Sequence, residues 1–117
     1  MINRVALTGR LTRDAQLAHT SSGRAYTRLT IAVDRVYRGR DGERETDFIS
    51  CTLWGRTAEA MSQYCQRGRL IAVTGQIRTS RYEKEGKRVY QTDVLIESIA
   101  FLDRRRQTEP EPDLQEA

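Results

Sequence analysis

The chain has 117 residues, enough for one hydrophobic core and too few for two. Its 20 basic and 16 acidic residues leave a formal charge of +4, with the basic excess in residues 1–102 and a net acidic end from residue 103 onward. A basic body favours a polyanionic partner. One histidine and two cysteines without CxxC spacing are too few for a zinc site, so we expect no metal and no cofactor. No apolar run is long enough for a signal peptide or a membrane span, which predicts a cytoplasmic protein with no membrane partner.

Alternation of apolar and polar residues with a period of two predicts three strands in the first 54 residues. "NRVALTGR" forms the first strand, and "YTRLTIAVD" forms the second, with Leu29 and Ile31 on its apolar face. "RGRDGE" contains the Asp-Gly pair that favours a hairpin turn. We therefore expect the second strand to fold back onto a third, "TDFISCTLWG".

A change to a period of three or four predicts a short helix in "RTAEAMSQYCQRG", with Thr57 as its N-terminal cap and Gly68 at its end. Two further strands, "RLIAVTGQIRTSRY" and "RVYQTDVLIESIAFLD", flank "EKEGK" as a second long hairpin. Five strands with one short helix between the third and the fourth predict an all-β, five-stranded OB-fold barrel. Residues 1–102 are expected to form this domain.

Residues 103–117, "DRRRQTEPEPDLQEA", contain two prolines, many charges and a single large aliphatic residue, Leu114. Such a segment cannot bury enough apolar surface to order itself. The sequence therefore predicts a flexible, net acidic C-terminal tail.

The third strand has two contrasting faces. Ile49, Cys51 and Leu53 make an ordinary core face, whereas the other face carries the aromatic residues beside hydroxyls: Phe48, Ser50, Thr52 and Trp54. Trp54 is the only tryptophan in the chain, and Phe48 is one of only two phenylalanines. An aromatic face among polar residues indicates a binding surface.

The same pattern recurs on the first strand of the second hairpin. Ile71, Val73 and Ile77 are expected to point inward, and the outward face ends in Tyr82 after Arg78. Rings among hydroxyls and arginines suit an unstacked nucleic-acid strand, because rings stack on bases and arginines contact phosphates. The alternative is that these rings pair across the sheet or are buried by a second subunit.

An enzyme is not expected. Asp34, Asp47 and Asp93 lie on different predicted strands and form no tight acidic motif for a catalytic metal, so we interpret them as solvated surface. No serine or cysteine has a nearby histidine base, and no glycine-rich phosphate loop precedes a helix.

Three segments, "NRVALTGRLTRDAQL", "TLWGRTAEAMSQYCQRG" and "VTGQIRTSRY", resemble in order and spacing the motifs of the bacterial single-stranded DNA-binding protein family. The resemblance implies a homotetramer of OB-folds that binds single-stranded DNA without sequence preference. It places base stacking on Tyr37, Phe48, Trp54 and Tyr82, and phosphate contacts on Arg4, Arg56, Arg67, Arg78 and Arg81. Alternation alone does not find Tyr37, which shares parity with the core residue Val33.

Two features depart from the family pattern. Asp14 is followed by Ala15 where the family usually has proline, and the tail "EPEPDLQEA" lacks the Pro-Phe tip by which family members recruit other proteins. The chain is therefore similar to the short members associated with competence for DNA uptake, with phages or with plasmids.

These features together predict a coat on single-stranded DNA near the nucleoid, with weak or no tail-mediated recruitment of replication and repair proteins. The process would be replication, recombination, repair or natural transformation. Two alternatives remain: a hub that recruits proteins through its tail, and a primosome-like or RNA-binding protein on the same barrel.

Overall fold

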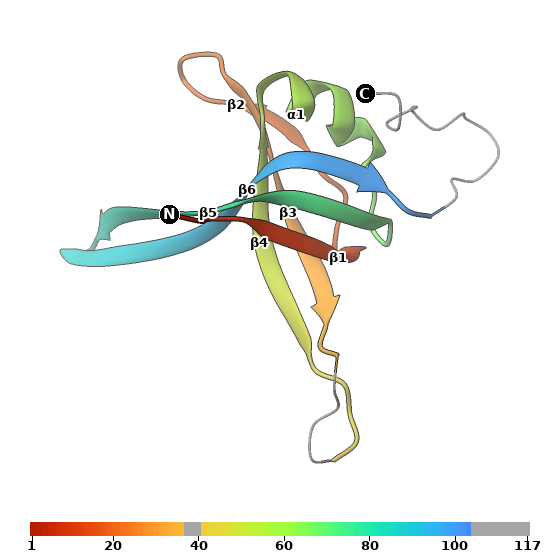
Figure 1. The fold of residues 1–117 in the computed structure, drawn as a ribbon. Coiled ribbons are helices and arrows are strands. Elements are labelled where there is room, and N and C mark those ends of the chain that lie inside the picture. The colour runs from red at the N-terminus through yellow and green to blue at the C-terminus, as the bar shows by residue number, and fades with distance from the viewer. Residues whose placement is uncertain (37–40, 104–117) are drawn as a thin grey trace.

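The computed structural model describes residues 1–36 and 41–103, and Figure 1 shows how the chain is arranged. The elements follow one another in this order: β1 (Val5–Leu11), β2 (Leu17–His19), β3 (Ala25–Asp34), β4 (Thr46–Trp54), α1 (Gly55–Met61), the 3-10 helix η1 (Ser62–Tyr64), β5 (Leu70–Lys84) and β6 (Lys87–Phe101).

Five of these strands close into a barrel. β1 pairs with both β3 and β5, β3 pairs with β4, β5 pairs with β6, and a short parallel pairing between β4 and β6 completes the circuit. This is the topology of an OB-fold, with α1 between the third and fourth barrel strands, so the predicted fold class is confirmed. The sequence did not predict β2, which pairs with the edge of β3 outside the barrel circuit.

Two glycines lie where neighbouring strands approach each other closely. A Cβ at Gly9 would lie 2.4 Å from the Ala32 carbonyl oxygen, and one at Gly75 would lie 2.0 Å from that of Leu95. Both distances are far below van der Waals contact, so the barrel closes at these points only because neither residue has a side chain.

The core lies inside the barrel, where the residues of predicted inward parity meet. Leu29, Ile31 and Leu53 are all at most 2% exposed, as are Ile71 and Val73 on β5. Ala58 covers one end of this core from α1. The apolar faces predicted for the second and third strands are therefore confirmed.

The β5–β6 hairpin is longer than the barrel needs and extends away from it, to the left in Figure 1. Its turn places Glu85 and Gly86 at φ values of 54° and 77°, the two positive angles of a type I′ turn. Ile77, predicted to point into the core, is 46% exposed, because it lies where the hairpin leaves the barrel. The prediction for Ile77 was therefore wrong.

The helix differs from its predicted bounds at both ends. It begins at Gly55, directly after β4, with Trp54 in the capping position and no side-chain cap, so Thr57 lies inside the helix. It ends through η1 at Tyr64. Gly68 instead forms the following turn, with φ +88° and its N–H donated to the Leu11 carbonyl.

Asp103 belongs to the folded domain, although the sequence assigned it to the tail. Its carboxylate accepts hydrogen bonds from Arg69 Nε at 2.9 Å and from the Leu70 backbone N–H at 3.1 Å. Arg69 is itself buried, and its guanidinium lies 4.4 Å from the centroid of the Phe101 ring. The predicted tail from 104 to 117 lies outside the described residues.

Candidate nucleic-acid interface

The outer face of the barrel carries a hollow of about 350 Å³, which we call the central groove. It lies over β3, β4, β5 and β6, so four strands far apart in sequence contribute to it. Most of the groove's lining residues are polar or aromatic, and the two arginines among them add positive charge; the lining is Thr20, Tyr26, Arg28, Thr52, Trp54, Arg78, Thr79, Ser80, Asp93 and Leu95.

An aromatic pair lines part of the groove. Tyr26 on β3 lies directly opposite Trp54 on β4, with ring centroids 5.3 Å apart and planes tilted by 37°. The guanidinium of Arg24 lies over the Trp54 ring, 4.4 Å from its centroid. Both rings are only half-buried, so they remain available to a flat ligand.

Asp93 on β6 also lines the groove. Its carboxylate accepts hydrogen bonds from the hydroxyls of Ser50, at 3.0 Å, and Thr52, at 2.5 Å. Arg78 lies directly opposite Asp93 in the β5–β6 register, and Arg28 lies opposite Thr52 in the β3–β4 register. One carboxylate thus joins β6 to β4 in a groove that two exposed arginines also line.

The three aspartates interpreted as solvated surface all have side-chain partners. Thr46 donates its hydroxyl to Asp34 at 2.8 Å, and Arg35 donates to both carboxylate oxygens of Asp47, at 3.0 and 3.2 Å. The hydrogen bond from Arg35 holds the pKa of Asp47 below its ordinary value. The solvated interpretation holds for Asp34, which is exposed, and for Asp47, whose side chain is 47% exposed. It does not hold for Asp93, which is half-buried and bonded to two hydroxyls of β4, because alternation gives the face of a residue and not its neighbours across the sheet.

Comparison with known proteins identifies the family. The sequence profile of the Single-strand binding protein family matches residues 2–102. The chain belongs to this family. It is 43% identical to Single-stranded DNA-binding protein 1 of Streptococcus pyogenes, over 97% of this chain and 98% of that protein. It is 47% identical to Single-stranded DNA-binding protein B of Bacillus subtilis, over 88% of this chain and 92% of that protein.

Other relatives are longer. The Single-stranded DNA-binding protein of Bacillus cereus is 47% identical over 90% of this chain, but that match covers 62% of the relative. Among solved structures, a deletion mutant of the single-stranded DNA binding protein from Thermus aquaticus superposes with a TM-score of 0.74 at 28% identity. That match covers 89% of this chain and 52% of the Thermus chain, so this chain spans about half its length.

The residues that match the family's stacking positions are spread along the outer face. Trp54 lines the central groove, while Phe48 lies farther along β4 opposite Ala32 and is 68% exposed. Tyr82 lies on the projecting part of the β5–β6 hairpin and is 48% exposed. Tyr37 lies outside the described residues.

Of the five arginines at family phosphate positions, Arg78 alone lines the central groove. Arg81 follows on the other face of the same hairpin, and Arg56 lies in α1. A guanidinium nitrogen of Arg4 lies 4.0 Å from a carboxylate oxygen of Glu97. The backbone N–H of Arg67 donates a hydrogen bond to the Asp14 carboxylate. All five side chains are exposed.

Sequence reasoning did not name four contributors to the groove as site residues: Arg24, Tyr26, Arg28 and Asp93. Tyr26 and Arg28 share a parity opposite to that of the core residue Leu29, which places both on the outer face of β3. The contact between Arg24 and Trp54 and the bonds to Asp93 depend on strand register, for which the sequence carries no local signal.

The two thiols are core residues. Cys51 and Cys65 are free and at most 1% exposed. Burial raises the pKa of Cys51 to about 12, assisted by the charge of Asp93, and burial raises that of Cys65 to about 11. Within residues 1–36 and 41–103, no group of three or more histidine, cysteine or acidic side chains is arranged to hold a metal ion. In that same part of the chain, no helix has the length and apolarity needed to cross a bilayer.

Proposed function

We propose that this protein binds single-stranded DNA without sequence preference and covers it. The observation that carries the proposal is the central groove, where the rings of Tyr26 and Trp54 lie beside Arg28 and Arg78. Bases that stack on such rings contribute about 1–3 kcal/mol each, whatever their identity. The names of the relatives from Streptococcus and Bacillus support the same partner.

In this proposal Phe48, Trp54 and Tyr82 stack on bases, as Tyr37 would, and the exposed arginines contact phosphates. The strand would run from the groove along β4 toward Phe48 and along the hairpin toward Tyr82. By family resemblance the protein acts as a homotetramer in the cytoplasm, in replication, recombination, repair or natural transformation. Recruitment of other proteins through the tail would be weak or absent.

Titration with oligo(dT) tests the proposal, with Trp54 fluorescence as the signal. We expect quenching on binding and an affinity that falls as salt rises, with a log-log slope of about −0.7 per phosphate contacted. Duplex DNA of the same length should compete poorly because its bases are already stacked. If an RNA oligomer competes better than DNA, the protein is an RNA-binding member of the fold. If the protein binds neither the DNA oligomer nor the RNA oligomer, the proposal is contradicted.

A further inference from the structure

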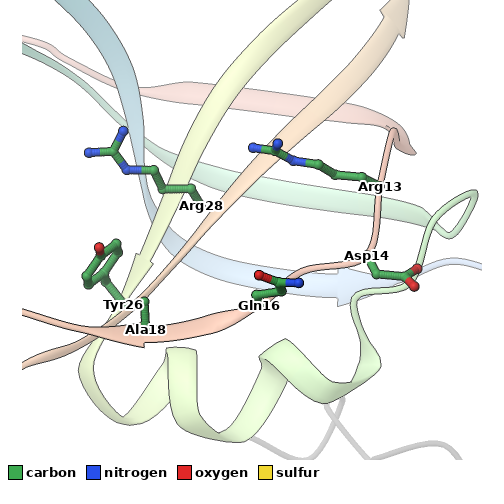
Figure 2. Close-up of a pocket in the computed structure, with 6 residues that line it drawn as sticks. All are labelled: Arg13, Asp14, Gln16, Ala18, Tyr26 and Arg28. Carbon is green, nitrogen blue, oxygen red and sulfur yellow. The ribbon is translucent and has the colours of Figure 1, made fainter.

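A second hollow, of about 430 Å³, lies beside the central groove. We call it the Arg13 pocket, and Figure 2 shows its six lining residues: Arg13, Asp14, Gln16, Ala18, Tyr26 and Arg28. Tyr26 and Arg28 line both hollows, so the two meet along β3. None of the positions matched to the family's stacking or phosphate contacts lines this pocket.

The Arg13 pocket has two free cations. Arg13 comes from the connection after β1 and Arg28 from β3, and Figure 2 shows both side chains extending along the same side of the hollow. Both are exposed, and neither forms an ion pair or a side-chain hydrogen bond with another residue of the described part of the chain. Two guanidinium groups that share a hollow, neither of them ion-paired within the described residues, favour an anion with several acceptor oxygens, such as a phosphate.

The pocket's one carboxylate does not neutralise these cations. Asp14 accepts the backbone N–H of Arg67 at 2.7 Å, and Figure 2 shows it at the far end of the hollow from Arg28. That bond ties the connection after β1 to the loop before β5, which fixes one wall of the pocket. The Asp14 wall of the pocket is therefore fixed by a hydrogen bond, while Arg13 and Arg28 have no ion-pair partner among residues 1–36 and 41–103.

The remaining polar groups suit a nucleobase. Gln16 offers an amide that can donate to and accept from a base edge, and Tyr26 offers a ring. Because the Tyr26 ring is also 5.3 Å from Trp54, a base against Tyr26 would continue the row of rings that begins in the central groove. The lining of the Arg13 pocket thus offers groups that can bind a phosphate and groups that can bind a base.

We propose that the Arg13 pocket is an additional subsite that holds one further nucleotide of the bound strand. Its phosphate lies between Arg13 and Arg28, and its base lies against Tyr26 within reach of Gln16. The strand therefore crosses β3 from the central groove toward the connection between β1 and β2. This inference rests on the proposed binding of single-stranded DNA.

The test compares Arg13→Ala with wild-type protein in titrations against oligo(dT) of increasing length and at several salt concentrations. Arg13 is the residue of choice because Arg28 also lines the central groove. For oligomers that fill only the central groove, the variant should bind like wild type. Once the oligomer is long enough to reach the pocket, the variant should bind several-fold more weakly, and its salt slope should be shallower by about 0.7.

Lys87→Ala is the matched control, because it removes one exposed positive charge at the tip of the β5–β6 hairpin. Any loss from overall charge alone should appear in both variants and at every length. Arg13→Lys should restore the salt slope, because it keeps the charge, while regaining less of the affinity, because it loses the forked donor.

A second measurement uses the wild-type protein and so does not depend on a variant's folding. Phenylglyoxal modification, read by mass spectrometry, should be suppressed at Arg13 by a long oligo(dT) and not by a short one. If wild-type protein binds but Arg13 is modified equally with and without the long strand, or if Arg13→Ala keeps the wild-type slope at every length, the subsite is wrong and the proposed function stands. If the wild-type protein binds no strand, the proposed function itself fails.

Discussion

The guanidinium of Arg24 lies over the indole ring of Trp54, 4.4 Å from the ring centroid. A cation on the face of an accessible aromatic ring contributes about 0.5–1 kcal/mol. The same ring face cannot hold Arg24 and a stacked base at once. Single-stranded DNA that stacks there must therefore displace this side chain, which then becomes free to contact phosphate.

This competition predicts a change of sign with salt for Arg24→Ala. At low salt the variant should bind oligo(dT) more weakly, because it lacks one cation for the phosphates. At high salt that loss is screened, and the variant should match or exceed wild type, because the ring no longer needs to be uncovered. Titrations at both salt concentrations measure the effect. An equal loss at every salt concentration would mean that Arg24 stays in place and stacks in the complex.

Phe48 should contribute to affinity and not to stability. It is 68% exposed, so Phe48→Ala removes little buried surface, whereas the lost base stacking should cost about 1–3 kcal/mol of binding free energy. Leu53→Ala is the comparison on the opposite face of the same strand, because Leu53 is fully buried and its truncation should cost about 2–5 kcal/mol of unfolding free energy. Thermal melts and oligo(dT) titrations of both variants separate the two roles. A melting temperature of Phe48→Ala as low as that of Leu53→Ala would assign Phe48 to packing.

Asp93 should stabilise the fold and lower the affinity for DNA. Asp93→Ala leaves the hydroxyls of Ser50 and Thr52 without their acceptor, and Thr52 is buried, so unfolding free energy should fall by about 1–3 kcal/mol. Asp93→Asn should lose less, because its amide still bonds to hydroxyls. Both variants remove a negative charge from a groove that contains Arg78, so DNA affinity at low salt should rise.

Asp34→Asn is the control for Asp93, since Asp34 accepts a hydrogen bond of 2.8 Å from the Thr46 hydroxyl and does not line the central groove. It should leave DNA affinity nearly unchanged. If Asp93→Asn folds normally yet binds DNA more weakly at low salt, the carboxylate contacts a base edge in the complex.

The buried thiols should be inert in the folded protein. Because folding raises the pKa of Cys51 to about 12 and that of Cys65 to about 11 from an ordinary value near 9, both are neutral thiols at pH 8. A chromogenic disulfide reagent should react slowly with native protein and rapidly in denaturant. Rapid reaction of the native protein at pH 8 would contradict the burial of these groups.

The same shifts fix the direction of the pH dependence. Above pH 9 the unfolded chain loses thiol protons that the folded chain keeps, so the contribution of these groups to stability is full below pH 9 and falls as pH rises toward 11 and 12. Urea denaturation at pH 8 and pH 10 should show the loss. Stability that rises over this interval would contradict the prediction.

Much of the barrel could be predicted because alternation reports which side of a strand is apolar. Leu29, Ile31 and Leu53 are buried as their parity requires. On β6 the rule fails between Ile96 and Ile99, which are both buried although their parity differs. Ser98 pairs with Thr74 and Ile96 with Gly75, so Glu97 is an extra residue, a bulge that moves later side chains to the other face.

The composition of the candidate site was less predictable than its location. The outward parity of Phe48 and Trp54 indicated the correct face of β4, because that property belongs to one strand. The bonds between Asp93 and the hydroxyls of β4 join residues more than 40 positions apart through a parallel pairing of two register positions. No property of either segment alone determines that alignment, so such contacts require the folded chain.

The double pairing of β1 also affects how the protein is made. Val5 pairs with Gly75 on β5, so β1 must wait for a partner that is synthesised 70 residues later. At about 5–20 residues per second this wait lasts about 3.5 to 14 seconds. During it, one edge of β1 has unpaired backbone groups that could pair with a neighbouring nascent chain. A closed barrel must wait still longer, for β6, whose pairings with β5 and β4 complete the circuit.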